Sequence, residues 1–66
     1  MKQLEITRRK KHLSLRALSA LSGVHYTVIS KIERGEVRCT YESAGALSRA
    51  LKCSRKSLYE PRRFKG

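Results

Sequence analysis

The chain has 66 residues, and its 16 Lys and Arg against 5 Asp and Glu give a formal net charge of +11. A chain this short has room for one domain with a small core, which leaves little space for the deep pocket of an enzyme. So large a positive charge repels itself unless a polyanion compensates it, and nucleic acid is the first polyanion to consider. No apolar segment is long enough to cross a membrane.

Cys39 and Cys53 are too few and too far apart in sequence to indicate a zinc site, and their number alone does not establish a disulfide. We therefore expect two free thiols, as in a reducing cytosol. The N-terminal segment lacks the apolar stretch of a secretory signal, so we expect a cytoplasmic protein. No carboxylate pair, activated nucleophile or phosphate-binding glycine loop is evident, and we expect no enzymatic activity, no cofactor and no metal.

Capping residues and glycines divide the chain into five predicted helices, so we expect an all-α fold. The first covers residues 2–11, where residues at three- and four-residue spacing share one face: Leu4, Thr7, Arg8 and Lys11. Ser14 is the predicted N-cap of the second helix, because its hydroxyl can accept from an unpaired amide of the first turn. The inner face of that helix is predicted to carry Leu15, Leu18 and Leu21. Gly23 ends it, since glycine tolerates the left-handed backbone of a tight turn.

The third predicted helix covers residues 25–34; Val24 fills the corner before it and Gly35 closes it. An advance of about 100° per residue gives this helix a core face, which consists of His25, Ile29 and Ile32. Its polar face consists of Thr27, Lys31 and Arg34, with Ser30 at the border and Tyr26 at the N-terminal end. A lone histidine such as His25 is more typical of a helix start or a surface than of a metal site or a pH switch. Glu33 points inward, where an unpaired carboxylate is costly, so we expect a cationic partner, and Arg8 is the candidate.

A fourth helix is predicted over residues 41–52, with Thr40 as its N-cap. Its inner face is predicted to carry Ala44, Leu47, Ala50 and Leu51. Gly45 inside this helix costs about 1 kcal/mol relative to alanine, so either close packing requires the glycine or the helix start is misplaced by a turn. Ser54 is the predicted N-cap of a short fifth helix that Pro61 stops. Residues 1–60 then form the domain, and residues 61–66 form a basic, mobile tail.

Residues 14–35 carry the strongest functional signal. Two short helices joined by a three- or four-residue turn containing glycine are typical of a helix-turn-helix, in which the second helix reads base edges. The alternative is that the polar face is an ordinary solvated surface. In a strongly basic chain, with a capped helix and a glycine corner before it, this alternative is less favoured. We therefore predict that the helix over residues 25–34 lies in the major groove of DNA.

The segment LRALSALSGVHYTVISKIERGE resembles the phage-repressor and Cro-like (XRE) helix-turn-helix family, which shares its G-V corner and its I-S-x-I-E-x-G run. Residues 44–58 are similar to the family's fourth helix and the start of its fifth. The resemblance implies a compact five-helix bundle of the lambda-repressor-like type. The sequence departs from the family pattern at Ser19 and Ser48, where alanines are usual, at His25, and in the loop before Thr40, which lacks the common proline.

The resemblance also implies which residues contact DNA. The base-contacting positions fall on Tyr26, Thr27, Ser30 and Lys31, of which Lys31 can donate to guanine O6 or N7. The phosphate-contacting positions lie at the start of the second helix and in the loop after the third, and they fall on the backbone amides near Leu15 and on Arg16, Arg34, Arg38, Thr40 and Tyr41. The buried arginine–glutamate pair of some members falls on Arg8 and Glu33.

We thus expect sequence-specific binding to double-stranded DNA by a small transcriptional regulator, a repressor that forms a homodimer on a palindromic operator in a bacterial or phage context. The main alternative is a partner-protein role, as in an antitoxin or antirepressor, for which four apolar side chains are expected to be exposed: Val37, Leu58, Tyr59 and Phe64. RNA binding is a third possibility, but RNA-reading modules depend mainly on sheets, aromatic platforms or glycine loops. Three Tyr and one Phe equip this chain poorly for base stacking.

Overall fold

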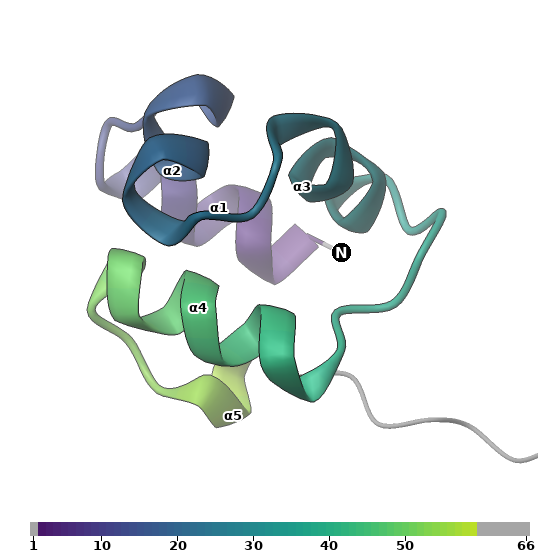
Figure 1. Cartoon of the computed structure of the whole chain (residues 1–66). Coiled ribbons are helices and arrows are strands. Elements are labelled where there is room, and N and C mark those ends of the chain that lie inside the picture. The colour runs from purple at the N-terminus through teal and green to yellow at the C-terminus, as the bar shows by residue number, and fades with distance from the viewer. Residues whose placement is uncertain (1, 60–66) are drawn as a thin grey trace, which may run out of the picture.

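The computed structural model describes residues 2–59, and within them the chain forms five α-helices and no strand. Their bounds are α1 Lys2–Lys10, α2 Leu15–Ser22, α3 Tyr26–Glu33, α4 Tyr41–Leu51 and α5 Arg55–Leu58. In Figure 1, α2 and α3 lie above α4, α5 lies below α4, and α1 passes behind. The predicted all-α, five-helix architecture is confirmed. Pro61 and the predicted basic tail lie outside the described residues.

The helix ends are set by local sequence. The hydroxyls of Ser14, Thr40 and Ser54 cap α2, α4 and α5, each accepting a backbone amide of the first turn at 3.0 to 3.2 Å. Gly23 and Gly35 follow α2 and α3 with φ of 81° and 79°, in the left-handed region that favours glycine. The predicted caps at Ser14, Thr40 and Ser54 and the predicted stops at Gly23 and Gly35 are confirmed. These helix ends are therefore set by their own residues.

The core is formed by buried apolar side chains from every helix and from the α3–α4 connection: Leu4, Leu18, Ile29, Ile32, Cys39, Ala44, Leu47, Leu51 and Leu58. The expectation that Leu21 points inward was wrong, because its side chain is 62% exposed. Three-residue steps rotate a side chain by about 300°, so Leu21 lies about 120° around α2 from Leu15. The expectation that Leu58 is exposed was also wrong: α5 packs on α4 and buries it.

The Arg8 side chain joins three segments of the fold. Its Nε lies 2.7 Å from Glu33 Oε2, its Nη2 lies 3.2 Å from Oε1, and its Nη1 donates to the Leu13 carbonyl at 2.8 Å. The two charged side chains are largely buried, with 11% and 9% of their surfaces exposed. The hydrogen bond with Glu33 raises the pKa of Arg8 above its already high ordinary value. The two residues paired in the sequence analysis are therefore in contact, and they hold α1, the α1–α2 loop and α3 together.

Gly45 lies in the second turn of α4, which begins at Tyr41, so the helix start is not misplaced. A Cβ at Gly45 would lie 2.9 Å from Nε of Arg55 and closer still to its Nη2. The end of the Arg55 side chain therefore occupies the space that a Cβ at Gly45 would need.

Replacing Arg8 with alanine is expected to lower the free energy of unfolding by about 3 kcal/mol, because the Glu33 carboxylate would stay buried without its partner. Unfolding in urea, followed by circular dichroism, measures the loss. Arg9→Ala is the matched control, because it breaks an exposed ion pair with Glu5 on the same helix and should cost less than about 1 kcal/mol. Equal losses in the two variants would contradict a special role for the buried pair.

Candidate nucleic-acid interface

The turn between α2 and α3 is short and tightly held. Gly23 takes the left-handed conformation, and the Ser22 hydroxyl accepts from the Val24 amide at 3.1 Å. Val24 is half-buried and packs against the core, as the sequence predicts for the residue that fills the corner. The turn thus fixes the direction in which α3 leaves α2.

One shallow hollow collects most of the predicted contact residues. Its volume is about 370 Å³, and it is lined by Leu15, Tyr26, Thr27, Ser30, Lys31 and Arg34. These include every residue predicted to contact bases, together with two of those predicted to contact phosphates. Because Leu15 begins α2, its amide precedes the first helical hydrogen bond and has no acceptor within the helix. The hollow therefore combines side-chain donors and acceptors with the N-terminal end of a helix.

Tyr26, the first residue of α3, is held between two neighbours. Its ring stacks on the His25 ring, with centroids 4.5 Å apart and planes at 25°, and the Arg16 guanidinium lies 5.2 Å from its centroid. The second contact is in the range of a cation–π interaction, which links α2 to α3 at the mouth of the hollow. Sequence spacing did not predict this contact, since Arg16 and Tyr26 belong to different helices.

His25 was expected on the core face of α3, and the structure shows it exposed instead. It is the N-cap, with φ of −60° and ψ of 142°, so its backbone lies outside the helix and the angular count does not apply to it. Its Nδ1 accepts the Thr27 amide at 3.2 Å and lies 2.8 Å from the Thr27 hydroxyl. In the tautomer that carries its proton on Nε2, Nδ1 accepts both the Thr27 amide and the Thr27 hydroxyl. The Thr27 oxygen is then an acceptor toward a ligand, which suits the amino group of adenine or cytosine.

The Arg34 side chain has an acidic neighbour that sequence analysis missed. Its Nε lies 2.7 Å from Glu36 Oε2, and both side chains are exposed. Helical spacing gives no signal for this pair, because the chain leaves the helix at Gly35. An exposed ion pair is worth at most about 1 kcal/mol, so a DNA phosphate can replace Glu36 as the partner of Arg34.

The remaining predicted phosphate contacts lie in the α3–α4 connection and at the start of α4. Arg38 is exposed. The Thr40 hydroxyl caps α4 and also donates to Ser43 Oγ at 3.1 Å, so its proton is already used. Tyr41 is 56% exposed, and its hydroxyl accepts from Arg55. Of these three side chains, Tyr41 and Arg38 are the ones that present polar groups to solvent.

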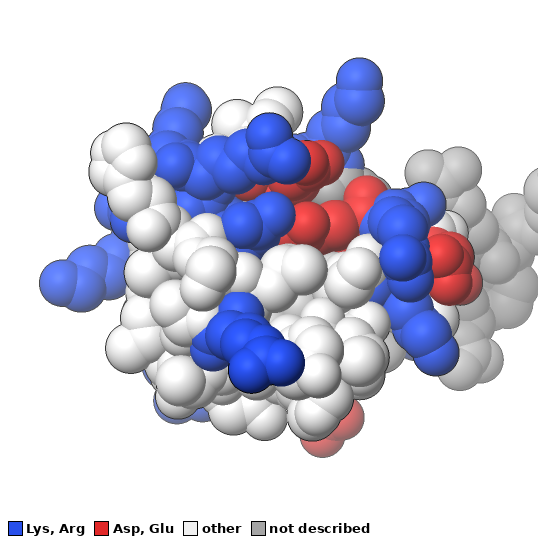
Figure 2. All heavy atoms as spheres, turned by 90° about the horizontal axis from the view of Figure 1, so that it is seen from above, with Lys and Arg blue, Asp and Glu red and all other residues white. Residues whose placement is uncertain are grey.

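Figure 2 views the molecule from the side on which α2 and α3 lie. Lys and Arg side chains gather along one edge and at both flanks of this face, and a basic side chain also projects from the middle of the white surface. Acidic side chains lie between the basic ones near that edge and at one flank. The excess of basic side chains suits a polyanion such as the phosphate backbone of DNA. Among residues 2–59, no helix is long and apolar enough to cross a membrane, and no group of three metal-binding side chains occurs.

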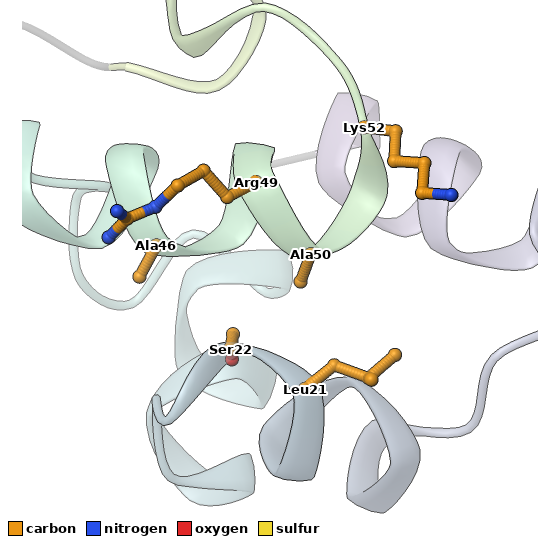
Figure 3. Close-up of a pocket in the computed structure, with 6 residues that line it drawn as sticks. All are labelled: Leu21, Ser22, Ala46, Arg49, Ala50 and Lys52. Atoms are coloured by element: carbon orange, nitrogen blue, oxygen red, sulfur yellow. The ribbon is translucent and has the colours of Figure 1, made fainter.

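A second hollow, of about 440 Å³, lies between α2 and α4. It is lined by Leu21, Ser22, Ala46, Arg49, Ala50 and Lys52. In Figure 3, Leu21 and Ser22 rise from α2 toward Ala46 and Ala50 on α4, with Arg49 and Lys52 on either side. It shares no lining residue with the hollow at α3.

A capped helix, a glycine turn and a second helix with a polar outer face define the helix-turn-helix class of DNA-binding domains. The family model described as Helix-turn-helix matches residues 4–58, which is most of the chain. The chain therefore belongs to the XRE and Cro-like helix-turn-helix family. This membership supports a DNA-binding regulator in general. No curated protein and no solved structure gives a significant match to the chain.

Proposed function

We propose that this protein is a transcriptional regulator that binds double-stranded DNA at a specific sequence, with α3 in the major groove. The observation that carries the proposal is the hollow at α3, where Tyr26, Thr27, Ser30 and Lys31 meet the N-terminal end of α2. The high net positive charge of the chain and its family support the same conclusion. Side chains that can read base edges thus lie next to groups that can hold a phosphate.

In this proposal the base contacts differ in chemistry. Lys31 is exposed, and no acidic side chain among residues 2–59 pairs with it. It therefore donates to guanine O6 or N7. Thr27 accepts from an adenine or cytosine amino group, because His25 takes its proton. Tyr26 and Ser30 contact the flanking bases.

The phosphate contacts fix the register of α3 on the duplex. They come from the amide of Leu15 and from Arg16, Arg34, Arg38 and Tyr41. The Thr40 hydroxyl, which was also expected to contact a phosphate, caps α4 and donates to Ser43 instead. One eight-residue recognition helix reads only a few base pairs. We therefore propose a homodimer on a palindromic operator, which acts as a repressor by occupying that site.

Lys31→Ala is expected to relax sequence preference at one position of each half-site, whereas Arg38→Ala should weaken binding to all duplexes and lower the salt slope by about one. Fluorescence anisotropy on cognate and random duplexes, at several salt concentrations, separates the two effects. Equal losses of affinity on both duplexes for both variants would refute the assignment of Lys31 to base contact and of Arg38 to phosphate contact.

A partner-protein role is the second candidate function, and the hollow between α2 and α4 favours it. Leu21 is exposed there beside Ala46 and Ala50. Arg49 and Lys52, at the sides of the hollow, have no acidic partner among the described residues. The complementary partner carries an aliphatic side chain among acidic ones.

Selection from a displayed library of random peptides tests this second function. We expect enrichment of acidic peptides that contain a leucine or isoleucine, and loss of their binding to Leu21→Ser. Ile6→Ser, which removes another exposed aliphatic side chain on α1, is the control and should bind them unchanged. No enrichment, or equal binding by Leu21→Ser, would reject the groove as a partner site.

A further inference from the structure

Tyr41 is an exposed side chain that is nevertheless held from two directions. The Arg55 guanidinium lies over its ring, with Cζ 4.2 Å from the centroid, and Nη1 of Arg55 donates to its hydroxyl at 2.6 Å. The Tyr59 ring meets it edge-on, with centroids 5.5 Å apart and planes at 90°. Packing alone would account for the ring contacts. It does not require the hydroxyl, which lies at the solvent side, to be fixed by an arginine.

The direction of the hydrogen bond decides what the hydroxyl can do next. A guanidinium only donates, so the Tyr41 oxygen accepts and its own proton must point elsewhere. No acceptor among residues 2–59 takes that proton. Accepting from a cation polarises the phenol and makes it a stronger donor. The group that best receives such a proton is an anionic oxygen.

Gly45 makes this arrangement possible. It lies one turn after Tyr41 on the same face of α4, and the Arg55 guanidinium crosses the helix there. A Cβ at this position would come within 2.9 Å of Nε and 3.0 Å of Cζ. Glycine in a helix interior is less stable than alanine. Because Gly45 has no side chain, the Arg55 guanidinium can occupy this space.

We propose that Arg55 is a positioning residue for DNA binding: it holds and polarises the Tyr41 hydroxyl so that this hydroxyl donates to a phosphate of the operator, and Gly45 provides the space for it. The inference rests on the proposed function, because it takes Tyr41 as one of the phosphate contacts. It adds two residues of α4 and α5 that do not touch DNA themselves.

The test uses the full chain and the duplex that it selects from random DNA. Tyr41→Phe removes only the hydroxyl. Arg55→Lys keeps the positive charge but removes the planar guanidinium that donates to this hydroxyl, and Gly45→Ala displaces that guanidinium. Each is expected to weaken binding to all duplexes by roughly tenfold, the effect of losing one hydrogen bond to a charged group. The salt slope should stay unchanged, since no variant changes the net charge. Arg9→Lys, on α1, is the matched control and should bind as the wild type does.

Two further measurements separate positioning from a purely structural role. The double variant Tyr41→Phe with Arg55→Lys should bind no more weakly than Tyr41→Phe alone, because Arg55 acts through the hydroxyl. Gly45→Ala should bind more weakly although its thermal midpoint is equal to or above that of the wild type. A structural role predicts the reverse, lower midpoints with unchanged affinity of the folded protein.

The inference is overturned if the three single variants bind as tightly as the wild type, or if the Arg55 and Tyr41 effects simply add, which would place Arg55 itself on the DNA. Either result leaves the proposed function intact as long as the wild type still selects a sequence. If the wild type binds no duplex, the proposed function fails and the inference fails with it.

Discussion

The ion pair between Arg8 and Glu33 is the interaction on which the rest of the structure depends. α3 has eight residues, too few to be stable as an isolated helix, so it needs partners in the tertiary structure. Ile29 and Ile32 anchor it in the core, but a small apolar core alone leaves its rotation weakly defined. The Arg8 guanidinium bonds both carboxylate oxygens of Glu33 and also donates to the Leu13 carbonyl, and these contacts fix α3 against α1. That rotation decides which side chains of α3 face outward.

Two glycines, Gly23 and Gly45, shape the structure around α3, and each does so for a different physical reason. Gly23 has no neighbour within 4 Å of where a Cβ would be, so its φ of 81° alone explains it: it allows the turn from α2 into α3. Gly45 has an ordinary helical backbone, and the guanidinium of Arg55 occupies the space that its Cβ would take. The first glycine meets a requirement of local backbone geometry, and the second concerns packing between α4 and α5. Only the first kind can be recognised from the sequence alone.

The same distinction explains which predictions succeeded. Caps such as Ser14 and Thr40 act within three residues, so the helices could be placed from sequence. Burial was predicted less well. The exposure of Leu21 follows from the rotation that accumulates over three-residue steps along α2, and the burial of Leu58 follows from the packing of α5 on α4. His25 was misplaced because a cap does not follow the helical angle. At the candidate site, angular counting placed Thr27 and Lys31 on the outer face of α3, where both are exposed. The Arg34–Glu36 pair and the Arg55–Tyr41 contact require the folded chain.

In the function that we propose, α3 reads base edges in double-stranded DNA. Selection of bound duplexes from a random library by the wild-type protein tests it most directly, because the chain itself reports what it recognises. We expect enrichment of one palindromic motif, with a guanine in each half-site where Lys31 is placed and an adenine or cytosine amino group where Thr27 is placed. Recovery of unenriched random sequence, bound only through charge and lost as salt is raised, would contradict it.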